Sequence, residues 1–88
     1  MRIIGLKAYR TGYTGFLENE EAYQFFNITK NRYKLVQSFP KNDFECRHHF
    51  MSLMGKFVKS SFFLKRPVAV SCVDMETLDR VHAGMKSS

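Results

Sequence analysis

The sequence contains no tryptophan, only two cysteines and only two prolines in 88 residues. Two cysteines cannot build a disulfide framework, which excludes a small secreted scaffold held together by disulfides. We expect Cys46, in a helical stretch, and Cys72, in a Val-rich run, to be free, partly buried thiols of a cytoplasmic protein. The chain also lacks the run of roughly 18–20 apolar residues that a membrane-spanning helix needs. Its basic N-terminus lacks the apolar centre of a secretory signal.

Acidic residues are scarce as well, since eight Asp and Glu accompany fourteen Lys and Arg, for a net charge of +6. Residues 30–66 hold nine cations and two acids, whereas residues 1–29 are neutral and residues 67–88 carry a net charge of −1. Positive charge concentrated in this way is typical of a surface that binds a polyanion. Solvation of the surface explains the same charges equally well.

Aromatic residues supply much of the apolar content, with nine Phe and four Tyr. Such a composition lies far from the disordered class and predicts a folded core dominated by rings. At 88 residues there is room for one domain, which we place over residues 1–88.

The first half of the chain reads as strands separated by turns. A β-branched run predicts an interior strand at residues 3–9. Two glycines three residues apart predict a turn or loop at 10–16, which can continue into a short strand at 13–17. We expect a hairpin of strands 21–28 and 32–39, joined by a tight turn at which Asn31 tolerates the left-handed conformation. A helix over residues 17–28 is the competing interpretation.

The second half predicts two helices around one more strand. Apolar residues fill one side of a helix over about residues 43–60, which Asn42 and Glu45 begin as a capping box. The apolar half comprises Phe44, Cys46, Phe50, Met51, Leu53, Met54, Phe57 and Val58. Residues 67–73 predict a strand buried on both faces, with Pro67 at its first position.

A short helix follows over about residues 75–83, with Asp74 as N-cap and Gly84 just past its end. The predicted fold is therefore α+β. A small antiparallel or mixed sheet of three to five strands packs against one long amphipathic helix and a short C-terminal helix.

Residues 45–49 contain an E-x-x-H and a C-x-x-H pair, spacings at which two metal ligands share a helix face. A zinc site needs three or four protein ligands, and Cys72 and His82 are the only further candidates. Burial explains the two cysteines more simply, and His48 and His49 lie on somewhat different sides of the polar face, so we predict no metal and no other cofactor. Cys46 lies on the core side of its helix, where a thiol stays protonated, and no phosphate-binding loop, dinucleotide fingerprint or nucleophile elbow is present. We predict that the protein is not an enzyme.

Basic residues form two predicted stripes. On a strand, Arg32 and Lys34 point to one face and Tyr33 to the other, so this ring cannot form a stacking platform with these charges. Two lysines one turn apart near the end of the long helix form the second stripe, which two cations of the following connector extend. The predicted nucleic-acid-binding residues are Lys30, Arg32, Lys34, Arg47, Lys56, Lys59, Lys65 and Arg66.

Two classes of function fit this sequence. The first is a non-enzymatic basic protein that contacts the nucleic-acid backbone, RNA or DNA, through the Lys/Arg face in residues 30–66. The second is a small regulator or inhibitor of the viral or phage type, which binds a host protein at an acidic surface or at a nucleic-acid site. Its anchors would be exposed aromatics, with Tyr9, Tyr13, Phe62 and Phe63 as candidates. We expect a monomer, or a homodimer paired through an edge strand.

Overall fold

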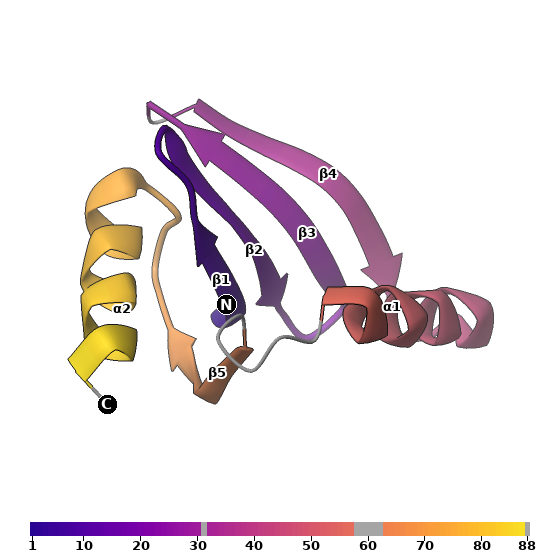
Figure 1. Ribbon diagram of the computed structural model, residues 1–88. Coiled ribbons are helices and arrows are strands. Elements are labelled where there is room, and N and C mark those ends of the chain that lie inside the picture. The colour runs from indigo at the N-terminus through magenta and orange to yellow at the C-terminus, as the bar shows by residue number, and fades with distance from the viewer. Residues whose placement is uncertain (31, 58–62, 88) are drawn as a thin grey trace.

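Five antiparallel strands form one sheet, and a helix packs against each of its two faces in the computed structural model (Figure 1). The structure describes residues 1–30, 32–57 and 63–87. The elements in chain order are β1 (Arg2–Ala8), β2 (Gly12–Glu18), β3 (Ala22–Thr29), β4 (Arg32–Pro40), α1 (Phe44–Phe57), β5 (Phe63–Ala69) and α2 (Met75–Ser87). The strand order is β4-β3-β2-β1-β5, so the predicted α+β fold is confirmed and β1 is interior as expected.

The hairpin of β3 and β4 is confirmed, and the alternative of a helix over residues 17–28 is wrong. Thr29 pairs with Arg32, which leaves a two-residue turn. Lys30 takes the left-handed conformation in this turn, with φ of 49°. Asn31, to which we assigned that role, lies outside the described residues.

β2 confirms the short strand raised at residues 13–17, and it also covers most of the stretch predicted as a turn or loop at 10–16. The glycines of this stretch serve close packing. Neither glycine has a positive φ, so the backbone conformation does not require them. A Cβ on Gly12 would lie 1.9 Å from the carbonyl oxygen of Ile28, and one on Gly15 would lie 2.7 Å from the Gly5 oxygen. Both glycines let neighbouring strands approach at places where any side chain would collide.

We expect Gly12→Ala and Gly55→Ala to change stability in opposite directions. The Gly12 variant should lose about 1–3 kcal/mol, because the new methyl meets backbone that cannot yield. Gly55 lies inside α1 with nothing within 4 Å of an added Cβ, so its variant should gain up to about 1 kcal/mol of helix propensity. Urea denaturation followed by circular dichroism measures both changes, and a stable Gly12→Ala protein would contradict the close approach.

The strand predicted at residues 67–73 is shifted and exposed. β5 spans Phe63–Ala69, so Pro67 lies inside it instead of at its start. Ile3 pairs with Val68 and Gly5 with Phe63, which leaves an irregular bend between these pairs that accommodates the proline. Residues 65–69 are exposed because β5 is an edge strand, so the expectation of burial on both faces is wrong.

Both helices begin at an aspartate that caps them. Asp74 accepts a hydrogen bond from the Thr77 backbone N–H at 2.7 Å and caps α2 as predicted. Asp43, and not Asn42, caps α1, since its carboxylate accepts from the Cys46 N–H at 3.1 Å. α2 continues through Gly84 to Ser87, so the predicted end at that glycine is wrong. The predicted extension of α1 to residue 60 lies outside the described residues.

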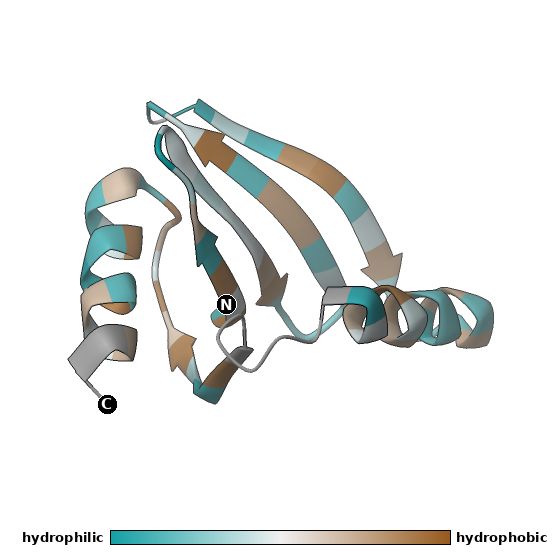
Figure 2. Ribbon diagram, in the orientation of Figure 1, coloured by the Kyte–Doolittle hydropathy of each residue, from teal (hydrophilic) through white to brown (hydrophobic). Residues whose placement is uncertain are grey.

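The sheet has a separate core on each face because neighbouring residues of a strand point to opposite sides. Figure 2 shows apolar and polar bands along β3 and β4. On one face, Leu78 of α2 packs against a cluster of Ile3, Leu6, Tyr13, Leu17, Phe26 and Ile28. On the other face, which we call the α1 face, Phe50 of α1 packs against Phe16 and Phe39.

α1 rests on the sheet through only part of its apolar side. Phe50 is buried, and Cys46, Leu53 and Met54 are half-buried around it at the spacing of one helix stripe. Phe44 and Met51 were expected in the core, but they are 77% and 66% exposed. α1 contacts the sheet near the end of β4 (Figure 1). Phe44 and Met51 lie on a side of the helix that is turned away from this contact.

Candidate nucleic-acid interface

A row of polar side chains crosses four strands on the part of the α1 face that the described residues leave uncovered. Lys7 of β1 is opposite Thr14 of β2, Thr14 is opposite Asn27 of β3, and Asn27 is opposite Lys34 of β4. Residues opposite one another in antiparallel strands share a face, so all four project to one side. The Thr14 hydroxyl donates to the Asn27 side-chain oxygen at 2.6 Å, between the two lysines.

Further cations lie at the end of the sheet next to this row. Gly12 pairs with Thr29, which sets the β1–β2 turn and the β3–β4 turn side by side. Arg10 is in the first turn and Lys30 in the second, and both are exposed. Arg32 is opposite Thr29 and therefore projects to the same face as Lys34.

One exposed ring belongs to this surface. Tyr9 is 51% exposed, and the Lys7 ammonium lies over its ring at 5.4 Å from the centroid. The Tyr9 backbone N–H donates to the Gly12 carbonyl at 2.7 Å, which holds the residue against the start of β2. We call this surface the cationic face and define it as Lys7, Tyr9, Thr14, Asn27, Arg32 and Lys34, with Arg10 and Lys30 in the adjoining turns.

Acidic side chains are segregated from the cationic face. Residues 7–14 and 27–34 contain five cations and no acid. Asp79 of α2 accepts a hydrogen bond from the Tyr13 hydroxyl at 2.5 Å, on the opposite face of the sheet. Burial, together with this carboxylate, raises the pKa of Tyr13 to about 12. The contact therefore holds the Asp79 carboxylate on the face of the sheet opposite to the cations.

Glu18 is at the other end of β2, where it forms ion pairs with Arg2 and Lys41. Partial burial by itself would raise the pKa of Glu18, but hydrogen bonds from Lys41 and Arg2 outweigh it and hold the pKa below its ordinary value. The remaining acids of the N-terminal third, Glu20 and Glu21, are in the turn after β2. The net charge of residues 1–29 is therefore zero although their cations Lys7 and Arg10 are at one end of the sheet and their acids are at the other.

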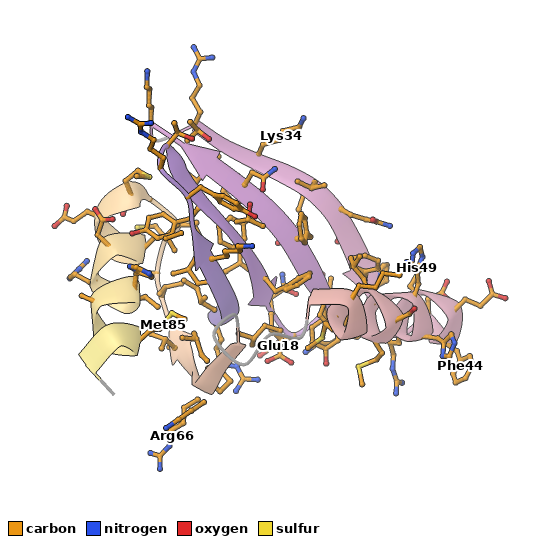
Figure 3. The ribbon with its side chains drawn as sticks, viewed as in Figure 1. Glu18, Lys34, Phe44, His49, Arg66 and Met85 are labelled. Carbon is orange, nitrogen blue, oxygen red and sulfur yellow. The ribbon has the colours of Figure 1, made fainter. Side chains whose placement is uncertain are left out.

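The predicted binding residues fall into three separate groups. Lys30, Arg32 and Lys34 come together at the cationic face as the hairpin suggested. Arg47 and Lys56 are on α1, which contacts the far end of β4. Lys65 and Arg66 are on β5, with three strands between them and β4. Figure 3 shows Lys34 and Arg66 at opposite ends of the molecule. Lys59 lies outside the described residues.

Sequence reasoning missed the part of the face that comes from β1 and β2. Lys7 and Arg10 are in the third of the chain whose charge sums to zero, so the charge count passed over them, and Tyr9 was expected only as an aromatic anchor for a protein partner. The available signal was local, because Lys7 and Tyr9 are two apart on a predicted strand and therefore share a face. Thr14 and Asn27 gave no signal of their own, since only the register of the strands places them between two lysines.

The thiols and the imidazoles of the described residues include Cys46, His48 and His49 on α1. In the described part of the chain, no group of three or more His, Cys, Asp or Glu side chains is close enough to hold a metal ion. Both cysteines are free, but Cys72 is exposed, not partly buried as expected. Partial burial and the nearby Asp43 carboxylate raise the pKa of the Cys46 thiol, which keeps it protonated.

Comparison of the chain with protein-family models, with curated protein sequences and with solved structures found no match. None of the helices in the described ranges has the length and apolar character to cross a membrane. Inferences about function therefore depend on the geometry and charge of this chain alone.

Proposed function

We propose that the protein is a non-enzymatic binding protein that contacts the backbone of nucleic acid, RNA or DNA, through the cationic face. The observation that supports this most strongly is the segregation of charge. Five cations from two hairpins lie at one end of the sheet without an acidic residue among them, and the register sets Lys7 and Lys34 on the same open face. Surface charge kept only for solubility is normally interspersed with charge of the opposite sign.

Phosphate oxygens are the ligands that such a surface suits. Lys and Arg side chains form charge-assisted hydrogen bonds to phosphate, and these contacts position a protein on the backbone without reading sequence. The free state of both cysteines supports our expectation of a reducing, cytoplasmic location, where RNA and DNA are available as partners.

The first measurement is fluorescence anisotropy of labelled single-stranded DNA, duplex DNA and RNA, titrated with the protein at several salt concentrations. We expect micromolar binding at low salt that weakens as salt rises, because the release of condensed counterions then gains less free energy. Three to five phosphate contacts give a slope of log K against log salt of about −2 to −3.5 for a single strand. Absence of binding to all three at low salt would overturn the proposal.

A protein partner is the second candidate, and exposure on α1 favours it. Phe44 and Met51 project from one side of the helix with Arg47 between them, which suits an acidic protein surface with an apolar pocket. Of the aromatic anchors expected from the sequence, Tyr9 is exposed but Tyr13 is buried in the core. Phe62 is outside the described residues, and the Phe63 side chain is not described.

Binding measurements on two variants, Phe44→Ser and a reversal of the charges on the cationic face, distinguish the two candidate functions. A complex with an acidic protein that Phe44→Ser abolishes and that survives reversal of the cationic face would support the second candidate. A complex with nucleic acid that shows the opposite dependence would support the first.

A further inference from the structure

We infer that the cationic face takes a single strand of nucleic acid, laid across the sheet strands with one base stacked on Tyr9, in preference to a duplex. The inference rests on the proposed function and specifies its ligand. Three features support it: the width of the platform, the position of the Tyr9 ring, and the polar pair between the two lysines.

The width of the platform excludes entry into the groove of a duplex. Four hydrogen-bonded strands, β1 to β4, present the row from Lys7 to Lys34. With neighbouring strands about 4.8 Å apart, the outer two are separated by three spacings, or about 14 Å, before side chains are added. The major groove of B-DNA is about 12 Å wide and admits a two-stranded ribbon, so this sheet is too broad for it.

The Tyr9 ring is a half-exposed stacking surface with a cation over it. The Lys7 ammonium lies over the ring at 5.4 Å from its centroid, so a base that stacks on that side takes the place of the ammonium, which then has the phosphate of the same nucleotide within reach. Aromatic rings bind unpaired bases in a sequence-tolerant way, whereas the bases of a duplex are already stacked and covered. A stacking platform needs its ring and its charges on the same face. Tyr33 does not meet this requirement, but Tyr9 does.

The Thr14–Asn27 pair suits the middle of a nucleotide. Its hydrogen bond engages the Asn27 side-chain oxygen, so the Asn27 NH₂ group is directed to other partners and can donate to a base edge or a sugar hydroxyl. Lys7 and Lys34 flank this pair on the outer strands. A strand of nucleic acid laid along this row therefore meets a lysine for its phosphates at each end and neutral polar groups in the middle.

The test measures anisotropy of a labelled 12-nucleotide single strand and of the same sequence as a duplex, at low salt. We expect the wild-type protein to bind the single strand at least tenfold more tightly. Tyr9→Ala should weaken single-strand binding about tenfold, Tyr9→Phe should restore it, and duplex binding should not change. Tyr33→Ala is the matched control, since Tyr33 is a tyrosine of similar exposure on the opposite face.

An abasic strand separates stacking from a structural role of the tyrosine. On a strand that lacks bases, the wild-type and Tyr9→Ala proteins should bind equally, whereas a merely structural defect would persist. Equal affinity for duplex and single strand, or no effect of Tyr9→Ala, would overturn the inference while salt-dependent binding still supported the proposed function. Absence of binding to either form at low salt would overturn both.

Discussion

Reversing two charges of the cationic face, in the variant Lys7→Glu/Lys34→Glu, is expected to lower affinity for a single strand by a hundredfold or more at low salt. The two lysines are on different strands of the same face, at the two ends of the row through Thr14 and Asn27. A hydrogen bond to a charged group contributes about 1.5–3 kcal/mol, so loss of both contacts removes about 3–6 kcal/mol of binding free energy. The new carboxylates also repel the phosphates.

The salt dependence of the same variant provides an independent measurement. Each phosphate contact contributes about 0.7 to the slope of log K against log salt for a single strand. Removing two contacts should therefore reduce the magnitude of that slope by about 1.4. A variant that lost affinity but kept the full slope would indicate misfolding, and circular dichroism checks that the sheet is intact.

A second double variant controls for net charge. Lys56→Glu/Lys65→Glu changes the formal charge from +6 to +2, as the first variant does, but its residues are on α1 and on β5, outside the cationic face. We expect it to bind within a few-fold of the wild type. If it lost as much affinity as Lys7→Glu/Lys34→Glu, total charge would explain binding and the assignment of the face would be wrong.

Local patterns predicted most of the secondary structure because their causes are local. The β3–β4 hairpin followed from two β-rich runs around a tight turn, and the start of α2 followed from the aspartate before it. β2 was recognised only in part, as a short strand at 13–17 that continues a predicted turn. Its glycines look like turn residues, but their reason is contact with backbone 10 to 16 residues away in sequence, at Gly5 and Ile28. Contacts of that kind become visible only when strands are paired.

The candidate site was predictable to the extent that it belongs to one hairpin. Alternation within β4 correctly set Arg32 and Lys34 on one face and Tyr33 on the other. The other half of the cationic face comes from β1, and the juxtaposition of Lys7 with Lys34 depends on the order of four strands. Charge counted along the chain grouped Lys34 with Lys65 instead, although β4 and β5 are the two edges of the sheet.

The helix pattern shows a related limit. Periodicity in α1 identified which residues are apolar on one half of the helix, but burial depends on how much sheet lies beneath that half. Phe50 packs in the aromatic cluster of the α1 face, whereas Phe44, six residues earlier, stacks on His48 of its own helix and remains 77% exposed. The same residue type in one predicted core therefore has two different environments.

That contrast leads to the largest expected effect on stability. Phe16→Ala should lower the free energy of unfolding by about 3–5 kcal/mol, since the ring is fully buried and its loss leaves a cavity. Phe16 makes edge-to-face contacts with Phe25 at 4.9 Å and Phe50 at 5.3 Å between ring centroids, so its removal loosens both the sheet and α1. Domains of this size have about 4–13 kcal/mol in total, so the loss is a large share.

Phe44→Ala is the matched control, because it removes the same ring from an exposed position in the first turn of α1 and should change stability by about 0.5 kcal/mol or less. Urea denaturation followed by circular dichroism compares the two, and Phe16→Leu keeps a measurable transition if the alanine variant is unfolded. Equal losses would show that α1 packs through its first turn.

Because Thr14 is two residues from Phe16 on the same face of β2, Phe16→Leu should also weaken nucleic-acid binding if this aromatic core holds the cationic face in register.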